Sequence, residues 1–252
     1  MDNRTKSEME FFNSRYRPTL ERVEPVPMRP VTSPEVVGSR DEAGAMYYIL
    51  GDLGGSQVLD LGCGIGIQSC QLMSLGAEVW ALDVSLVAMK VVRTRAEVSR
   101  LAARLRPVVG SAEELPFPCD LFDVVFGCGV LHHIDVSRVA KEVKRVLKPS
   151  GMGLFSEPLG INPVLQFARE RLPHLGPKES PGGRALIRAD LQTLRRTFAS
   201  VEIRGTHLLS SLMKTGRLTS LWPWLVEIDK FLIHNWPSLN EWCSGALVIL
   251  RK

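Results

Sequence analysis

Three glycines at alternate positions, Gly62, Gly64 and Gly66, separate a short apolar run from a helix-like segment. The run 58–61 has the composition of a buried parallel strand, and the helical pattern begins near Ile67. Glycine tolerates positive φ and lets a ligand approach the backbone closely. A strand, a glycine turn and a helix N-terminus in this order predict a nucleotide-type site in an α/β protein.

The spacing of the glycines narrows the class of ligand. The dinucleotide fingerprint reads G-x-G-x-x-G, whereas this turn reads G-x-G-x-G and follows Asp60. An acidic side chain there suits a ligand with a cationic amino group better than a pyrophosphate. Asp83 ends the next apolar run, where a carboxylate can accept both ribose hydroxyls. Nicotinamide-binding folds share that feature, so Asp83 alone does not discriminate. A plain βα turn without a ligand is the remaining alternative.

Five more motifs follow the glycine turn along the chain. Together the six resemble the class I S-adenosylmethionine-dependent methyltransferases and, with the next strand, span about residues 57–157. Each motif is weak alone, so their common order carries the resemblance. The matching stretches are VLDLGCGIG at 58–66, ALDVS at 81–85, GSAEELPF at 110–117, FDVV at 122–125, VLHH at 130–133 and VLKPSG at 146–151.

Strand and helix patterns alternate through this region, which predicts an α/β fold with a doubly wound parallel sheet. The resemblance implies a Rossmann-like sheet of seven strands, the last of them antiparallel. We expect strands at 57–61, 78–83, 106–109, 122–128, 151–157, 201–204 and 246–251. We expect helices at 67–75, 85–104, 135–148, 162–172 and 190–198, with Lys148-Pro-Ser-Gly151 stopping the third.

The chain divides into three parts. Residues 36–205 and 243–252 form the expected cofactor-binding domain. Residues 1–35 form an N-terminal segment with a helix over 7–16, which could close over the ligand as a lid, and a proline-rich linker. The aromatic side chains of that helix are Phe11, Phe12 and Tyr16.

Residues 206–242 form an expected helical insertion before the final strand, and they hold four of the five tryptophans. Three interpretations stay open for it. It could be a helical cap on the sheet edge, a lid over an apolar acceptor pocket, or an interfacial helix for a lipid-like acceptor. The tryptophans are Trp222, Trp224, Trp236 and Trp242.

The resemblance implies S-adenosylmethionine as the cofactor and assigns parts of it to the motifs. The glycine turn would pass against the amino-acid portion, with Asp60 nearby, and Asp83 would hold the ribose. Ser111 stands where the family commonly has an aspartate, so its contact with the adenine amino group would be weaker. The residues implied at the cofactor are Asp60, Gly62, Cys63, Gly64, Asp83, Val84, Ser111, Ala112, Glu113 and Cys128.

His132 and His133 directly follow the fourth expected strand. Imidazole titrates near neutral pH, so either histidine could act as a general base. The alternative is a helix-entry residue that makes only backbone hydrogen bonds. Methyl transfer from a sulfonium needs chiefly alignment and exclusion of water, and only some acceptors need a base. No His, Cys, Asp and Glu cluster has metal-ligand spacing, so no metal is expected.

Composition limits the partners. The net charge of +4 is mild and gives no case for nucleic-acid binding. Gly127–Val130 replaces the Asn/Asp-Pro-Pro-Tyr/Phe motif of enzymes that methylate nucleic-acid bases, which argues against DNA and makes RNA a poor candidate. Five cysteines without a C-x-x-C pair and a polar N-terminus favour a cytoplasmic protein. Stable membrane insertion is not expected, peripheral contact stays open, and the oligomeric state is not predicted.

These observations favour an enzyme that transfers a methyl group from S-adenosylmethionine to a small-molecule acceptor by in-line displacement. An apolar or natural-product-like acceptor is one option, and the sequence does not distinguish oxygen, nitrogen and carbon methylation. One alternative is a fold relative that binds the cofactor without turnover and acts as a partner subunit. The other is an NAD-dependent oxidoreductase, which the glycine spacing disfavours.

Overall fold

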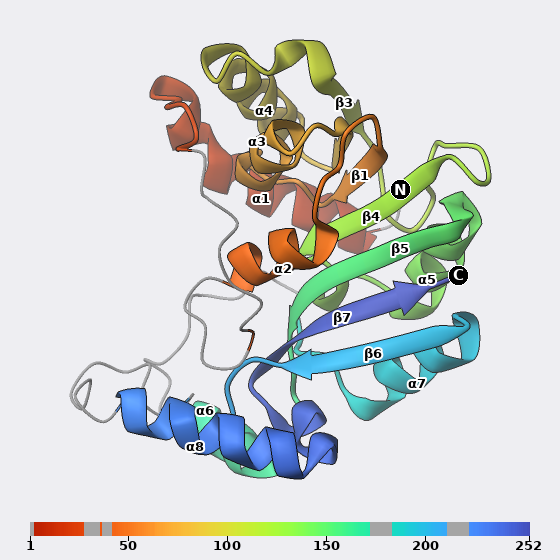
Figure 1. Ribbon diagram of the computed structural model, residues 1–252. Coiled ribbons are helices and arrows are strands. Elements are labelled where there is room, and N and C mark those ends of the chain that lie inside the picture. The colour runs from red at the N-terminus through yellow and green to blue at the C-terminus, as the bar shows by residue number, and fades with distance from the viewer. Residues whose placement is uncertain (1–2, 28–35, 37–41, 172–182, 211–221) are drawn as a thin grey trace.

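The computed structural model describes residues 3–27, 36, 42–171, 183–210 and 222–252 (Figure 1). Its centre is a seven-stranded sheet of order β3-β2-β1-β4-β5-β7-β6. β7 runs antiparallel to both of its neighbours, and the remaining pairs are parallel. The doubly wound sheet with an antiparallel last strand is therefore confirmed. The strands are β1 (Gln57–Leu61), β2 (Glu78–Asp83), β3 (Leu105–Val109), β4 (Phe122–Cys128), β5 (Leu147–Pro158), β6 (Ser200–Gly205) and β7 (Gly245–Arg251).

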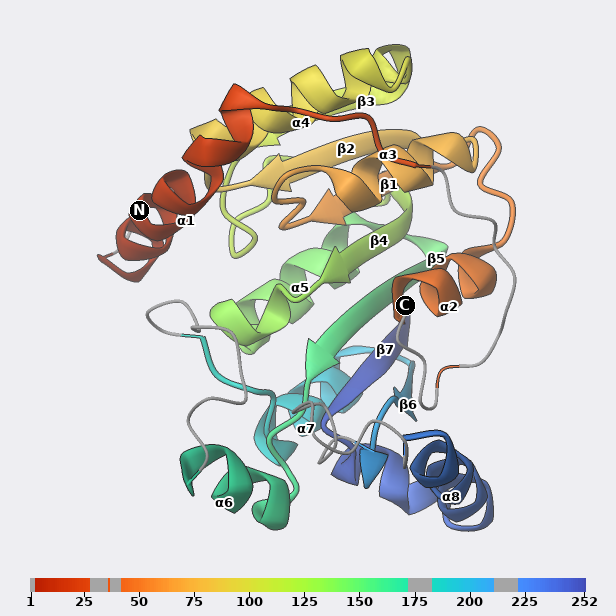
Figure 2. The ribbon, with the colours of Figure 1, turned by 90° about the vertical axis from the view of Figure 1, so that its left-hand side faces the viewer.

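Helices cover both faces of the sheet. One face carries α2, α3 and α4, and the other carries α5 and α7. α1 lies beside α4 at one end of the molecule, and α8 lies beyond the ends of β6 and β7 (Figures 1 and 2). The helices are α1 (Asn3–Glu21), α2 (Glu42–Leu50), α3 (Ile67–Ser74), α4 (Leu86–Val98), α5 (Val136–Val146), α6 (Pro163–Arg171), α7 (Arg188–Thr197) and α8 (Trp222–Asn235).

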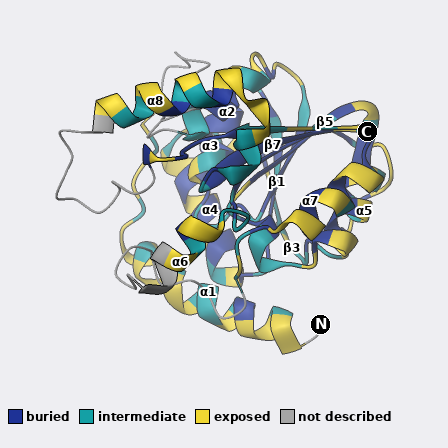
Figure 3. Cartoon of the chain, turned by 90° about the horizontal axis from the view of Figure 1, so that it is seen from below, coloured by how far each residue is buried: buried dark blue, intermediate teal, exposed yellow. Residues whose placement is uncertain are grey.

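The strands are apolar on both faces because both faces are covered. In β7, Leu247 and Ile249 pack toward the α2–α4 side, whereas Val248 and Leu250 pack toward the α5–α7 side. This period of two follows from the pleat of a strand. Figure 3 shows the result as a buried sheet between helices whose outer faces are exposed. Packing of the core holds the sheet together, and the order of the strands determines which strand ends lie next to each other.

The single helix expected over 85–104 is wrong, because α4 ends at Val98. Arg100 adopts a φ of 60°, and the N–H groups of Arg100 and Leu101 donate to the carbonyls of Glu97 and Ala96. This is a Schellman ending, whose left-handed position is usually glycine. Because arginine occupies that position, no residue there signals the end of the helix. A separate 3₁₀ helix, Ala102–Arg104, leads into β3.

The helix expected over 135–148 ends at Val146, and the stop predicted at Lys148-Pro-Ser-Gly151 is also wrong. β5 begins at Leu147, which pairs with Phe122 of β4, and the pairing resumes only between Val124 and Met152. The expected helix stop is thus a bulge in β5 that takes up the extra residues. Lys148 Nζ secures it on β4, 2.8 Å from Asp123 Oδ1.

The N-terminal segment and the insertion before the final strand each contain a long helix. α1 is longer than the predicted helix over 7–16 and continues past Pro18. Most of the linker, and residues 172–182 and 211–221, lie outside the described residues. β6 pairs with β7 along the whole length of β6, although the insertion separates the two strands. The described residues of that insertion include α8 and a 3₁₀ helix, Pro237–Trp242.

Candidate functional site

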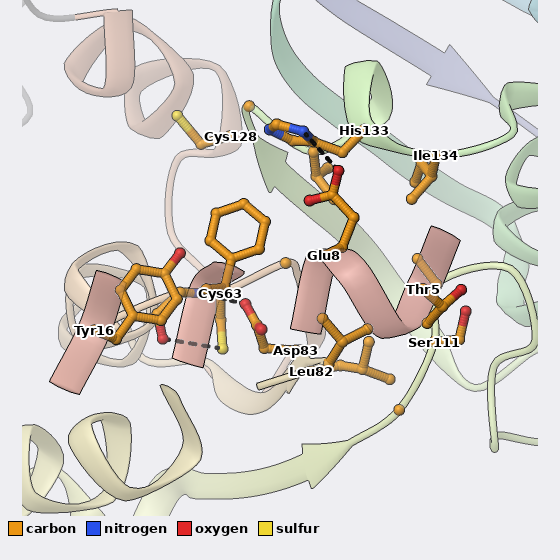
Figure 4. Close-up of a pocket in the computed structure, with 18 of the residues that line it drawn as sticks. Thr5, Glu8, Tyr16, Cys63, Leu82, Asp83, Ser111, Cys128, His133 and Ile134 are labelled. Atoms are coloured by element: carbon orange, nitrogen blue, oxygen red, sulfur yellow. Dashed lines mark hydrogen bonds and ion pairs between the residues drawn. The ribbon is translucent and has the colours of Figure 1, made fainter. Parts of the chain in front are cut away.

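A cavity of about 560 Å³ opens at the carboxyl ends of the parallel strands, under α1 (Figure 4). It lies where the strand order reverses between β1 and β4, the usual ligand crevice of a doubly wound sheet. Its walls come from α1, the glycine turn after β1, the ends of β2 and β4, and the loop after β3. The sequence-predicted residues that line it are Gly62, Cys63, Gly64, Asp83, Val84, Ser111, Ala112, Glu113, Cys128, His132 and His133.

The glycine turn needs all three glycines. Gly62, Gly64 and Gly66 have φ values of 68°, 52° and 78°, which side chains rarely adopt. A Cβ on Gly62 would lie 2.6 Å from Cγ2 of Val130, and one on Gly66 would lie 2.8 Å from Cγ2 of Val92. The turn is therefore closed on two sides by packing, and its backbone at Gly62 and Gly64 faces the cavity.

Asp83 ties the glycine turn to the end of β2. Its Oδ2 accepts from the N–H of Gly64 at 3.0 Å, and its Oδ1 accepts from the N–H of Ser85 at 2.9 Å. Burial raises the pKa of the Asp83 carboxyl, and these backbone hydrogen bonds act in the opposite direction. Asp83 thus has a structural task in addition to the ribose contact that the sequence predicts.

Asp60 is the one predicted cofactor residue that is absent from the cavity lining. Its side chain is almost fully buried behind the turn, where Oδ2 accepts from Ser69 Oγ of α3 at 2.6 Å. Burial raises the pKa of Asp60 to about 7, although the Ser69 hydrogen bond opposes the shift. The strand's alternation turns this carboxyl toward α3. Its effect on a bound amino group stays a prediction, and any such effect would act through the turn.

The loop after β3 holds its side chains in place internally. Ser111 Oγ accepts from the N–H of Glu113 at 3.2 Å. The Glu113 carboxylate accepts from the N–H of Asp135 and from Arg138 Nη1, at 2.9 and 2.8 Å. Glu113 therefore binds the start of α5, and Ser111, Ala112 and Glu113 all line the cavity. The predicted adenine contacts of these residues stay predictions.

α1 forms the roof of the cavity, and its closing as a mobile lid stays a prediction. Phe12 and Tyr16 line the cavity and stack on each other with centroids 5.6 Å apart, whereas Phe11 is outside the lining and packs edge-on against Phe12. Figure 4 shows Tyr16 beside Cys63 and Asp83. Burial, together with the charge of Asp83, raises the pKa of the Tyr16 phenol well above its usual range.

Asn13 fastens the roof, and the sequence did not reveal it. Its Oδ1 accepts from Ser85 Oγ at 2.7 Å and from the N–H of Val87 at 3.3 Å, at the N-terminus of α4. At the other end of the roof, a guanidinium nitrogen of Arg4 donates to the carbonyl of His133. Residues more than 70 positions apart meet here, so no local pattern could have indicated the contacts.

The two histidines have different environments. His132 Nδ1 lies 2.8 Å from Oε2 of Glu157, a buried residue at the end of β5. His133 Nδ1 lies 3.9 Å from Oε1 of Glu8 on the roof (Figure 4). Burial lowers the pKa of His133 to about 4, helped by His132 and nearby arginines. Sequence reasoning missed Glu157 and Glu8. Of the two, only Glu157 has a local sequence signal, because it stands in Ser-Glu-Pro after an apolar run.

Cys128 ends β4 and lines the cavity as expected. Burial, and the nearby carboxylates of Glu157, Glu42 and Asp60, raise the pKa of its thiol to about 12. The thiol is therefore protonated at neutral pH and is a poor nucleophile. Over the described ranges, no three His, Cys, Asp or Glu side chains are grouped to hold a metal ion. Within the same ranges, no helix has the length and apolar character to cross a membrane.

The order of the sheet and the place of the cavity match the class I methyltransferase fold. A family model described as "Methyltransferase domain" matches residues 59–155. A sterol 24-C-methyltransferase of Gibberella zeae is 32% identical over 221 residues, 81% of this chain and 55% of that one. A ubiquinone biosynthesis O-methyltransferase of Bradyrhizobium diazoefficiens is 36% identical over 41% of this chain and 40% of its own length. Residues 59–155 thus match a methyltransferase domain, and the chain is similar to named methyltransferases over a larger part of its length.

Solved structures show the same fold at low identity. Geranyl diphosphate C-methyltransferase from Streptomyces coelicolor superposes with a TM-score of 0.61 and 13% identity, over 99% of this chain and 97% of that one. The [4+2]-cyclase SpnF superposes with a TM-score of 0.60 and 19% identity, over 98% and 94%. The chain spans about half or less of the length of the curated relatives it matches first.

Proposed function

We propose that the cavity binds S-adenosylmethionine and that the chain transfers its methyl group to a small-molecule acceptor. The observation that carries this proposal is one continuous wall, on which the glycine turn, Asp83 and Ser111–Glu113 lie together. Three segments far apart in the sequence thus offer a backbone cradle, a ribose acceptor and an adenine edge. A cavity of about 560 Å³ accommodates a ligand of this size.

When bound, this donor supplies a methyl group activated by the positive charge on sulfur. The chain's task is to hold and orient it, and to keep water out. Gly62 and Gly64 would hold the amino-acid portion through the backbone, and Asp83 would hold the ribose. Phe12 and Tyr16 close the cavity from above. The acceptor would enter between the roof and the segment after β4.

The proposed acceptor is a small molecule with an apolar body. Relatives named for sterol and ubiquinone methylation, and a structural neighbour named for geranyl diphosphate, support this choice. Relatives named for glycine and sarcosine methylation point to a small amine instead. The proposal includes neither DNA nor RNA as a substrate.

The proposed location of the protein is the cytoplasm. Its five cysteines are free, as expected in a reducing compartment, and fractionation of the native host tests this location.

Calorimetric titration tests the donor. We expect binding heat with S-adenosylmethionine and S-adenosylhomocysteine and none with NAD. Heat with NAD alone would overturn the proposal. A labelled-methyl screen over isoprenoid alcohols, quinols, glycine and sarcosine then tests turnover and separates the acceptor classes.

A second candidate function is cofactor binding without methyl transfer. The specific observation that favours it is the SpnF neighbour, which shares the fold but is named as a cyclase. In the labelled-methyl screen, tight binding of S-adenosylmethionine with no labelled product from any acceptor class would favour this second function.

A further inference from the structure

Glu157 holds the segment after β4 from below. Its side chain is fully buried, and Oε1 accepts from the N–H groups of Val130 and Leu131 at 2.8 and 2.7 Å. Oε2 faces the backbone N–H of His132 at 3.3 Å and its ring Nδ1 at 2.8 Å. One carboxylate therefore fixes both the backbone of this segment and the orientation of an imidazole.

The same contacts fix the position of the proton on the His132 ring. A carboxylate has only acceptors, so Nδ1 must donate to Glu157 and carry the hydrogen. In neutral imidazole, Nε2 is then the unprotonated acceptor. Across the described part of the chain, Nε2 of His132 has no hydrogen-bond partner. The ring lines the cavity, with 16% of the side chain exposed.

His133, the neighbouring candidate, has a different environment. Its Nδ1 is 3.9 Å from Glu8, beyond hydrogen-bond distance, and burial lowers its pKa to about 4. An imidazole with so low a pKa accepts a proton poorly at neutral pH. The sequence does not favour either histidine as the base, whereas their environments in the structure favour His132.

We propose that His132 is the general base of the methyl transfer and that Glu157 is a positioning residue that sets its tautomer. This inference rests on the proposed function. A lone pair on the acceptor's oxygen or nitrogen forms the bond to the methyl carbon, and the carbon–sulfur bond breaks with its electrons remaining on sulfur. The acceptor's proton moves to Nε2, while the Nδ1 hydrogen stays on the ring beside Glu157. The acceptor is therefore a hydroxyl or an ammonium group that must lose a proton.

Substitution Glu157→Gln tests the tautomer. The N–H groups of Val130 and Leu131 hold the amide oxygen at the place of Oε1, which puts the amide NH₂ against Nδ1. Nδ1 must then accept, so Nε2 carries the hydrogen and can no longer act as a base. ¹⁵N spectra of histidine-labelled protein should show His132 protonated at Nδ1 in wild type and at Nε2 in the variant. We expect kcat to fall about 100-fold or more, with unchanged affinity for S-adenosylhomocysteine.

Glu202→Gln, on the exposed edge strand β6, is the matched control and should keep wild-type kcat. His132→Ala is a second variant that keeps Glu157 and its contacts with Val130 and Leu131. It should lose kcat similarly and regain part of it with added imidazole.

Two results would overturn the inference alone. One is an Nε2-protonated His132 in wild type, and the other is full turnover in a Glu157→Gln variant that binds S-adenosylhomocysteine normally. Absence of S-adenosylmethionine binding in wild type would instead overturn the proposed function.

Discussion

At the scale of single residues, Gly62 joins the glycine turn to the segment that carries His132. A side chain there meets two obstacles, the φ of 68° and a contact of 2.6 Å with Val130. We expect Gly62→Ala to lower the free energy of unfolding by more than the roughly 1–2 kcal/mol of left-handed strain. We also expect it to weaken binding of S-adenosylhomocysteine, since the turn must shift. Urea unfolding and calorimetry measure the two effects.

Gly51→Ala is the matched control for this prediction. Gly51 has a φ of 66° but nothing within 4 Å of an added Cβ, so it reports the strain alone. Equal losses of stability in the Gly62 and Gly51 variants would show that the contact with Val130 contributes nothing.

Asp60 should make the free energy of unfolding depend on pH. Its pKa in the folded chain is about 7, above the usual aspartate pKa of 3.8. The folded state therefore binds the proton more tightly than the unfolded state does. The contribution of Asp60 to the free energy of unfolding is fully present below about pH 4 and is lost as the pH rises to about 7. We expect the wild type to lose stability against Asp60→Asn across this window, because asparagine does not titrate. Chemical unfolding at several pH values measures the difference. A constant difference would contradict the raised pKa.

The residues that could be predicted from the sequence share a local signal. Gly62, Gly64 and Asp83 sit at a strand end or turn whose pattern is contained in a few neighbouring residues. Glu157 and Asn13 could not be predicted, because they act on partners 25 or more positions away. Only the packed sheet and roof bring these pairs together.

At the scale of elements, α8 is anchored to the chain after β6 by one carboxylate. Asp229 is fully buried and accepts from the N–H groups of Leu208, Leu209 and Ser210, and from the hydroxyl of Ser210. The outer face of α8 is exposed, with Trp224 the most exposed large apolar side chain on it. The described residues of the insertion are absent from the cavity lining. This arrangement supports the cap interpretation over the acceptor lid for those residues.

We expect Asp229→Ala to release this anchor. Three N–H groups would lose their acceptor, two of them buried, at about 1–3 kcal/mol for each group that stays buried. Amide hydrogens of α8 should exchange faster, while those of β1 and β4 stay protected. Glu227→Ala, which removes an exposed ion pair with Lys230 on the same helix, should leave exchange unchanged. Equal protection of α8 in the two variants would contradict the anchor.

The element boundaries show where sequence patterns lose information. Strand β1 and helix α3 were placed correctly, because the glycine turn punctuates them. The end of α4 was missed because Arg100 takes a position where glycine is the usual signal. The start of β5 was missed because Lys148–Gly151 resembles a helix stop, whereas strand pairing turns it into a bulge.

At the scale of the whole molecule, the cavity exists only because α1 closes over the reversal point of the sheet. Its floor belongs to the packed sheet, whereas polar contacts help to hold its roof in place. Asn13 accepts two of these, from Ser85 and from Val87. A roof fastened at this point can open without disturbing the strands beneath. Ligand entry and release should therefore depend on Asn13 more than the fold does.

We expect Asn13→Ala to speed dissociation of S-adenosylhomocysteine about 5- to 10-fold, which corresponds to roughly 1 kcal/mol of lost hydrogen bonding. Thermal stability should change little, because Asn13 lies outside both large apolar clusters. Stopped-flow displacement measures the dissociation rate. Asn235→Ala, which removes an exposed contact on α8, is the control and should keep the wild-type rate. If both variants release the ligand at the wild-type rate, the fastening of α1 does not control release, and the roof opens at another point.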